Sequence, residues 1–135
     1  MGSRSVKAQA RPVINHIAVY VVNLQTSTFF YKDVIGLEMI PEPFHDGRHS
    51  WFAIGCNAAL HIIQGAKAAT VHDKDSHLCF SVPSVEEFTQ RLDKNNVAYE
   101  NWPGQAKSVT TRPDGVKQIY FKDPDGFWIE VNDAK

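Results

Sequence analysis

The sequence lacks the features that mark membrane-spanning and nucleic-acid-binding proteins. Its apolar runs are short, the longest covering residues 17–22, whereas a transmembrane helix needs about 20 consecutive apolar residues. Its formal net charge is only −1, with basic and acidic residues mixed along the chain. A basic surface for nucleic acid and a basic amphipathic helix for a membrane are therefore both excluded.

Cysteine is also scarce. The chain has 2 cysteines, Cys56 and Cys79, which form no metal-binding or redox spacing motif. Cys79 lies inside a predicted strand. This usage favours a reduced, cytoplasmic setting over a disulfide-stapled secreted fold.

The chain is long enough for one domain with a proper core. Its 135 residues are 43% hydrophobic, which is normal for a globular protein of this size. Residues 1–12 are small and polar without periodicity, and we expect a disordered segment or a tag there. The predicted domain covers residues 13–135.

The first half of this domain predicts the order strand, helix, strand, strand, strand. Asn23 or Thr26 can cap the helix, and Gly36 suits the left-handed position that ends it. Asp46-Gly47 is typical of a turn between the second and third strands. The four predicted strands cover residues 13–22, 38–40, 50–54 and 59–64.

After a linker over residues 66–75, the same order of elements returns. Ser84 followed by Glu87 predicts the start of a capped helix, which Lys94, Asn95 and Asn96 end. The four predicted strands of this half cover residues 77–82, 97–100, 117–122 and 127–132. The chain is therefore an internal repeat of two modules, 13–65 and 76–132, with an α+β fold.

One carboxylate stands out in the last strand. Glu130 lies between large apolar residues, where a charge is costly unless a positive group meets it. No Lys or Arg occupies a comparable mid-strand position, but His16, His61 and His77 do. His16 and His77 open the first strand of their modules, while His61 and Glu130 lie in the fourth.

Three imidazoles and one carboxylate at equivalent strand positions predict one divalent metal ion. The first and fourth strands of each module should bring their inward side chains together, while the opposite faces pack on the helices. Imidazole and carboxylate suit borderline first-row cations, so Zn²⁺, Ni²⁺, Co²⁺, Mn²⁺ and Fe²⁺ are all candidates. Four protein ligands leave room for water or substrate.

Four segments of the chain together have the pattern of a known family. They are Asn15-His16-Ile17-Ala18-Val19, Phe29-Phe30-Tyr31-Lys32-Asp33-Val34-Ile35-Gly36-Leu37, Ser76-His77-Leu78-Cys79-Phe80-Ser81-Val82 and Phe121-Lys122-Asp123-Pro124-Asp125-Gly126-Phe127-Trp128-Ile129-Glu130-Val131. In this order and spacing they resemble the vicinal oxygen chelate superfamily, which includes glyoxalase I, bleomycin- and fosfomycin-resistance proteins and ring-cleaving dioxygenases. The resemblance covers nearly everything from Ile14 to Asn132.

The resemblance implies paired βαβββ modules around a metal-binding cavity, usually in a homodimer whose sites can be shared between chains. His16, His77 and Glu130 match the ligands of the family, and His61 falls where glyoxalase I has a glutamate. Glu130 is then the candidate catalytic base. Tyr20 and Gly65 stand where glyoxalase I has an arginine and an asparagine that bind glutathione, so the resemblance leaves the use of glutathione open.

Three functions follow from this reading. The first is a divalent-metal-dependent lyase or isomerase of glyoxalase I type, similar to lactoylglutathione lyase, acting on a small α-oxo or hemithioacetal substrate. The second is an Fe²⁺- or Mn²⁺-dependent dioxygenase, and the third is a ligand-binding protein of the bleomycin-resistance kind. In each case Tyr20, Tyr120 and Trp128 are candidates to line the pocket.

Overall fold

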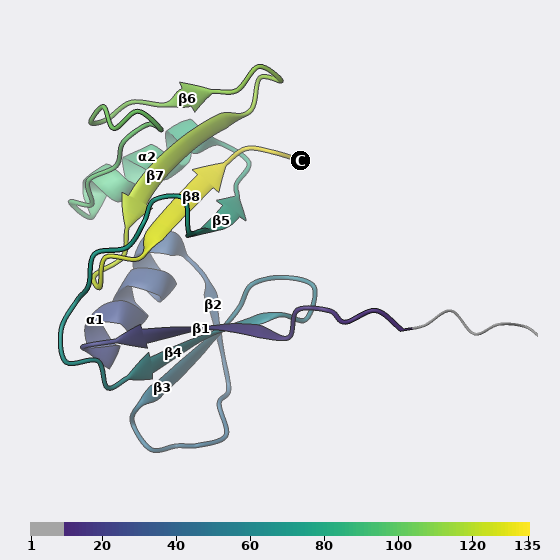
Figure 1. Ribbon diagram of the computed structural model, residues 1–135, viewed down its shortest axis with the longest axis vertical. Coiled ribbons are helices and arrows are strands. Elements are labelled where there is room, and N and C mark those ends of the chain that lie inside the picture. The colour runs from purple at the N-terminus through teal and green to yellow at the C-terminus, as the bar shows by residue number, and fades with distance from the viewer. Residues whose placement is uncertain (1–9) are drawn as a thin grey trace, which may run out of the picture.

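The computed structural model describes residues 10–135, arranged as two four-stranded sheets with helices between and beside them (Figure 1). Residues 10–15 carry no regular structure, so the first strand begins later than predicted. The rest of the expected disordered segment or tag, residues 1–9, lies outside the described residues. The expected α+β class with two modules is confirmed.

The first sheet is built from four strands of module one. These are β1 (His16–Val21), β2 (Glu38–Ile40), β3 (His49–Ala53) and β4 (Ala59–Gln64). Their order in the sheet is β1-β4-β3-β2, with β1 and β4 parallel and the other pairs antiparallel. The first and fourth strands are therefore neighbours, as the predicted repeat requires.

The helical segment of module one changes character partway. α1 (Leu24–Phe29) is α-helical and η1 (Phe30–Ile35) is π-helical, where the sequence predicts one continuous helix. Asn23, and not Thr26, is the cap, since its side chain accepts from the Thr26 N–H at 2.9 Å. Gly36 ends the segment with φ 93°, the left-handed conformation predicted for it. No helix within residues 10–135 has the length and apolar character needed to cross a bilayer.

Module two repeats this plan with one correction. Its elements are β5 (His77–Ser81), α2 (Val85–Lys94), β6 (Thr110–Thr111), β7 (Lys117–Lys122) and β8 (Trp128–Asn132), and its sheet order is β5-β8-β7-β6. The strand predicted over residues 97–100 is wrong. Only Glu100 pairs there, through a single bridge to Tyr120 and another to Ala106, and β6 takes the edge position instead.

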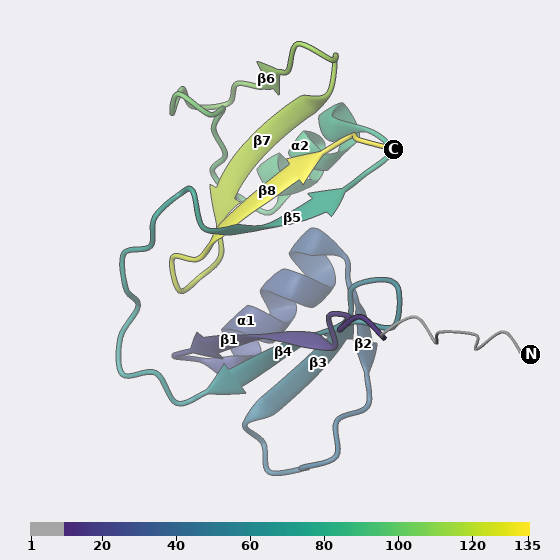
Figure 2. The same ribbon diagram turned by 45° about the vertical axis from the view of Figure 1, so that its right-hand side comes forward.

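Both sheets bury one face in the same core. In β1 and β4 the buried side chains include Val19, Val21, Leu60 and Ile62, and in β7 and β8 they include Ile119, Phe121, Ile129 and Val131. Phe30, Tyr31, Val34 and Ile35 of η1 join this cluster, and so do Val85, Phe88 and Leu92 of α2. Figure 2 shows α1 between the two sheets. The opposite faces of both sheets therefore point away from the shared core.

The turn before β8 ties the two modules together. Asp123 accepts a hydrogen bond of 2.6 Å from the Tyr31 hydroxyl, and Asp125 accepts one of 2.8 Å from the Val22 N–H. Ser27 also donates to Asp125 at 3.2 Å. Both carboxylates are buried. The turn is thus more than a connection, because its carboxylates satisfy donors of module one.

Candidate functional site

In module two, β5 and β8 bring the predicted ligands His77 and Glu130 together. His77 Nε2 lies 3.3 Å from Glu130 Oε1. The other ring nitrogen, Nδ1, lies 2.8 Å from the backbone carbonyl of Lys74, which can only accept, so Nδ1 carries the proton. The Nδ1 hydrogen bond turns Nε2 toward Glu130, so a cation between Nε2 and Oε1 would have both atoms as ligands.

Glu130 is a buried carboxylate surrounded by donors. It is 6% exposed, and its Oε2 accepts from the Gln118 and Asn132 amides at 3.0 and 2.9 Å and from the Cys79 thiol at 3.2 Å. Burial alone would raise the pKa of Glu130, but these donors outweigh it and the pKa is lowered. Glu130 is therefore ionised at neutral pH.

The same surroundings raise the pKa values of two neighbours. Burial, followed by the contact with the Glu130 carboxylate, raises the pKa of the Cys79 thiol to about 12. Burial and the same carboxylate also raise the pKa of the Tyr120 hydroxyl. Both groups stay protonated at neutral pH, so Glu130 carries the negative charge of this face.

In module one, the predicted ligands His16 and His61 lie together on β1 and β4. Their rings stack with centroids 4.0 Å apart, and the Trp51 ring stacks on the other side of His61 at 3.8 Å. His16 Nδ1 lies 2.7 Å from the Asn15 side-chain oxygen, so Nδ1 donates, and Nε2 makes no hydrogen bond among the described residues. Burial lowers the pKa of His61 and keeps it neutral.

The two pairs hold equivalent places in the two sheets. His16 is the register partner of Ala59 and Ala18 that of His61, so the two histidines are diagonal neighbours on parallel strands. In the second sheet His77 pairs with Trp128 and Cys79 pairs with Glu130, which gives the same diagonal relation. The predicted pseudo-symmetry of the four residues therefore holds at the level of strand register.

A single chain does not bring all four residues together. Within residues 10–135, the structure contains no group of three or more His, Cys, Asp or Glu side chains that could hold a metal. The reason is that the two pairs lie on faces that point away from the shared core. The four-residue site thus stays a prediction.

A cavity of about 550 Å³ opens beside His16 and His61. Its walls are mainly rings, since Phe44 lies 4.5 Å from His49 and 6.1 Å from Trp51, measured between centroids. The sequence pattern singled out neither Trp51 nor His49 as a site residue, although both line this cavity. Trp51 and His49 belong to β3 and share the face of His61, with which Trp51 is in register. Adjacent Trp51 and Phe52 are both apolar, so alternation could not decide which one is buried.

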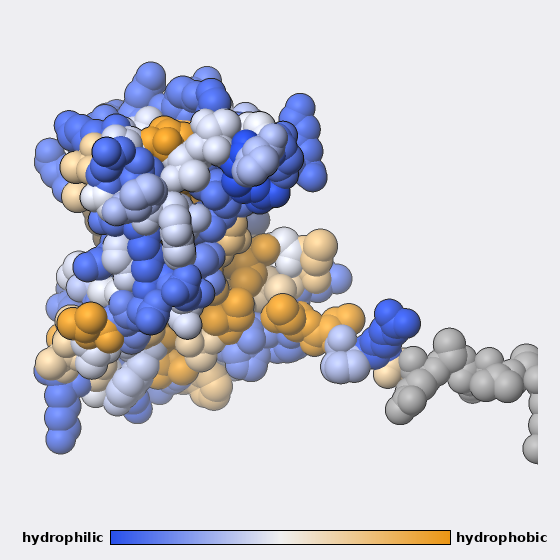
Figure 3. All heavy atoms as spheres, turned by 45° about the horizontal axis from the view of Figure 1, so that its top comes forward, coloured by the Kyte–Doolittle hydropathy of each residue, from blue (hydrophilic) through white to orange (hydrophobic). Residues whose placement is uncertain are grey.

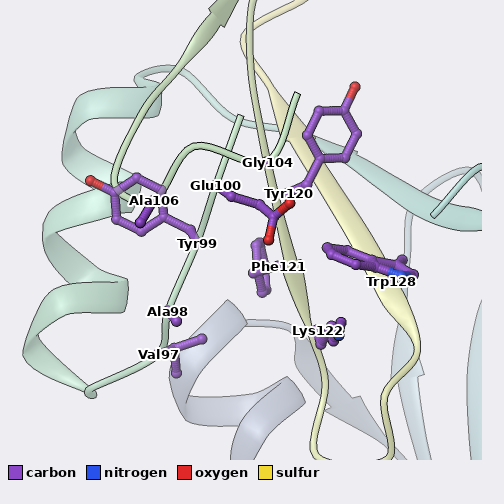
Figure 4. Close-up of a pocket in the computed structure, with 10 residues that line it drawn as sticks. All are labelled: Val97, Ala98, Tyr99, Glu100, Gly104, Ala106, Tyr120, Phe121, Lys122 and Trp128. Carbon is purple, nitrogen blue, oxygen red and sulfur yellow. The ribbon is translucent and has the colours of Figure 1, made fainter. Parts of the chain in front are cut away.

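A second cavity, of about 310 Å³, lies in module two next to Tyr120 and Trp128 (Figure 4). Its wall also includes Glu100. Tyr20, the third predicted pocket residue, lines neither of these two cavities. It borders a smaller hollow of about 140 Å³ formed with the linker.

The fold and the paired donors define the class of protein. The profile of the Glyoxalase/Bleomycin resistance protein/Dioxygenase superfamily matches residues 13–131, and the chain belongs to this superfamily.

Individual relatives are distant and differ in activity. The chain is 24% identical to "Glyoxylase I 4" of Arabidopsis thaliana over 87% of its own length and 68% of the relative. It is 29% identical to the metallothiol transferase FosB of Shouchella clausii, covering 88% of this chain and 78% of the relative. Among solved structures, a glyoxalase family protein from Bacillus anthracis superposes with a TM-score of 0.71 at 28% identity, covering 95% and 99% of the two chains.

Proposed function

We propose that the protein is a divalent-metal-dependent enzyme of glyoxalase type, active as a homodimer in which each site takes two ligands from each chain. One observation carries this proposal. His16 with His61, and His77 with Glu130, are matched pairs at equivalent registers on two faces that point outward from one core. Each pair is half of a four-donor set, so a second chain is the simplest source of the missing half.

The free sheet edges support such a dimer. β1 and β5 are the end strands of their sheets and pair on one side only within the described residues. Large apolar side chains are exposed along and before β1, including Val13 at 87%, Ile14 at 68% and Tyr20 at 54%. Figure 3 shows hydrophobic side chains gathered where the described chain begins. An open strand edge beside apolar surface favours pairing with another strand.

The donor set fits a first-row cation. His16 and His77 each donate their Nδ1 proton to an oxygen, so Nε2 is the nitrogen that would bind a cation, while His61 is neutral and Glu130 is ionised. These are the protonation states that metal ligands need. A bound cation would act as a Lewis acid on the carbonyl oxygen of a chelating substrate.

Glu130 is the residue to which we assign proton transfer. Isomerisation of a hemithioacetal moves a proton from the carbon that bears sulfur to the adjacent carbonyl carbon, and the hydroxyl proton to the former carbonyl oxygen, so it needs a base and no co-reactant. Glu130 is the only carboxylate among the four donors. The Gln118, Asn132 and Cys79 donors hold Oε2, and Oε1 faces His77.

The cavity of module one points to a substrate with an uncharged, apolar body. Its volume of about 550 Å³ falls within the usual range for small-molecule sites. Its lining has no Lys, Arg, Asp or Glu among the described residues, and it is rich in rings. A glutathione carboxylate would find no cation there. The substrate class is therefore a small α-oxo compound, or its adduct with a thiol, that carries an aliphatic or aromatic group.

Metal binding by mixed dimers tests the shared site. His16→Ala/His61→Ala chains lack one half and His77→Ala/Glu130→Gln chains lack the other. Each variant alone should bind little Zn²⁺ or Ni²⁺. After the two are unfolded together and refolded as an equal mixture, half of the dimers should be mixed, and each mixed dimer should hold one intact site. Metal content should then recover to about one quarter of the wild-type value. A mixture that stays as empty as its components would contradict a site shared between chains.

An activity assay tests the reaction. With the best-binding cation, we expect isomerisation of the hemithioacetals of methylglyoxal and phenylglyoxal with 2-mercaptoethanol, and its loss in Glu130→Gln. Phenylglyoxal should be preferred, because its ring can enter the apolar cavity. If none of the first-row cations supports turnover of either adduct, the glyoxalase assignment is withdrawn. Oxygen uptake with a catechol would point to an oxygenase instead.

A further inference from the structure

The linker between the modules is fixed at Lys74 by an unusually complete set of contacts. The Lys74 ammonium donates to Glu100 Oε2 at 2.6 Å and to the backbone carbonyls of Asn101 and Trp102 at 2.9 and 3.1 Å. An ammonium has three protons, and each of them has an acceptor here. The Lys74 side chain is only 18% exposed.

Three aromatic rings complete the surroundings of this ammonium. Nζ lies 4.9 Å from the centroid of Tyr120, 5.0 Å from Trp128 and 5.6 Å from Trp102. These distances are within the range of cation–π attraction. We call Glu100, Trp102, Tyr120 and Trp128 the ammonium box. Three of its members, Glu100, Tyr120 and Trp128, are seen around the cavity in Figure 4.

The backbone of the same residue orients His77. The Lys74 carbonyl accepts the His77 Nδ1 proton at 2.8 Å, which directs Nε2 to Glu130. Two residues earlier, the His72 carbonyl accepts from the Trp128 indole at 3.1 Å. The ammonium box therefore holds the linker at its side chain and at its backbone, immediately before the strand that carries His77.

We propose that Lys74 is a positioning residue for the metal centre: the ammonium box fixes the Lys74 carbonyl, and this carbonyl keeps His77 in the tautomer that can bind metal. The inference rests on the proposed function, since it takes His77 to be a ligand. Lys74 acts through His77 and does not itself touch the metal. Without the box, the linker carbonyl is free to turn away, and His77 loses the acceptor that selects its tautomer.

The test uses Lys74→Met, which keeps most of the apolar stem and removes the charge and its three donors. Lys122→Met is the matched control. It also removes an ammonium that lies near the Trp128 ring, 4.8 Å from its centroid, but Lys122 is exposed. The first readout is the ring-nitrogen NMR spectrum of metal-free protein at a pH where His77 is neutral. The Glu130 carboxylate, 3.3 Å from Nε2, competes with the Lys74 carbonyl for the single proton of the neutral ring. We therefore expect a larger share of the Nδ1–H form in the wild type and in Lys122→Met than in Lys74→Met, where more of the proton should move to Nε2.

The second readout is the dissociation constant for Zn²⁺, which should rise about 10- to 100-fold in Lys74→Met, the usual range for losing a group that orients a ligand. Lys74→Arg, which keeps the charge, should restore part of the affinity. If Lys74→Met does not fold, Glu100→Gln tests the same box and should shift both readouts in the same direction.

If the His77 tautomer is unchanged in Lys74→Met, the positioning role is overturned, even if the variant is less stable. The same holds for Glu100→Gln if Lys74→Met does not fold. Failure of the proposed function looks different. In that case the tautomer shifts as expected, but wild-type protein binds Zn²⁺ no more tightly than His77→Ala does.

Discussion

The two outward faces of the molecule share a fold and a strand register, yet they differ in chemistry. The face of module one is a series of rings, in which His61 lies between His16 and Trp51. The face of module two is polar, and Glu130 there accepts hydrogen bonds from three side chains. Duplication has kept the positions of the donors and changed what surrounds them.

This difference indicates how the two faces would divide the work of a shared metal site, with charge on one face and apolar contact on the other. His61 and Glu130 hold equivalent places on β4 and β8, but burial keeps the first neutral while its donors keep the second charged. A cation shared between the faces would therefore take its charge compensation from module two. The apolar part of a substrate would lie in module one, where the cavity is larger.

The largest expected effect tests this division directly. Loss of a residue that only orients a ligand raises a metal dissociation constant about 10- to 100-fold, so loss of a ligand should cost at least as much. His61→Gln, which removes a neutral donor, should raise the dissociation constant for Zn²⁺ about 100-fold, and Glu130→Gln, which removes the one charged donor, should raise it well beyond about 100-fold. Calorimetric titration of the metal-free proteins measures both constants.

Glu86→Gln is the control for removing a carboxylate from module two, since Glu86 pairs with Lys117 on the surface of α2. It should leave the dissociation constant unchanged. If His61→Gln weakens binding more than Glu130→Gln does, the charged half of the centre is not in module two.

The next effect concerns the junction that fixes the two faces relative to each other. Tyr31→Phe removes the hydroxyl that donates to the buried Asp123 carboxylate, and it should lower the free energy of unfolding by about 1–3 kcal/mol at neutral pH. Burial, followed by Asp123, raises the pKa of Tyr31 well above its usual value of 10.0. Above pH 10 the unfolded chain loses this proton while the folded chain keeps it, so this contribution to stability declines as pH rises.

The difference in stability between wild type and Tyr31→Phe should therefore narrow as the pH is raised above 10. Urea unfolding at a series of pH values measures it. Tyr20→Phe is the matched control, because Tyr20 is exposed. A difference that is constant from pH 7 to pH 11 would show that Tyr31 titrates in the folded state as it does in the unfolded chain.

Sequence patterns predicted most of the elements that position these faces. The strands at 59–64 and 117–122 agree with the structure at both ends, and the Ser84 cap forms as predicted, with its hydroxyl accepting from the Glu87 N–H. These segments have strong local signals, namely alternation and a capping residue. The pairing of His16 with His61 and of His77 with Glu130 followed from the repeat.

The remaining features depend on contacts that leave no local pattern. Residues 97–100 include Val97 and Tyr99, which favour strands, but Asn101 bonds with Gln105 and turns the chain, so that only Glu100 forms bridges. β6 has only two residues, too few for alternation to be seen. The linker contact of Lys74 with Glu100 joins residues far apart in sequence. The separation of the two donor pairs follows from the shared core, which no strand pattern reveals.

The smallest expected effect tests the apolar half of the comparison. Trp51→Leu should weaken binding of acetophenone, an uncharged aromatic ketone, about 3- to 10-fold, since one stacked ring is worth about 0.5–1.5 kcal/mol. The Trp51 indole N–H is buried without an acceptor in the described part of the chain. Its removal therefore breaks no hydrogen bond, and the change reports on ring contact alone. NMR titration of metal-free protein gives the constants.

Trp102→Leu makes the matching change in module two, where the ring lies 5.3 Å from Tyr120 between centroids. It should leave acetophenone binding within about twofold of wild type, because a contact outside the site adds little. Benzoate should bind more weakly than acetophenone to the wild type, since the cavity of module one has no cation in its described lining to meet the carboxylate. Equal losses in Trp51→Leu and Trp102→Leu would mean that the aromatic ligand does not distinguish the two faces.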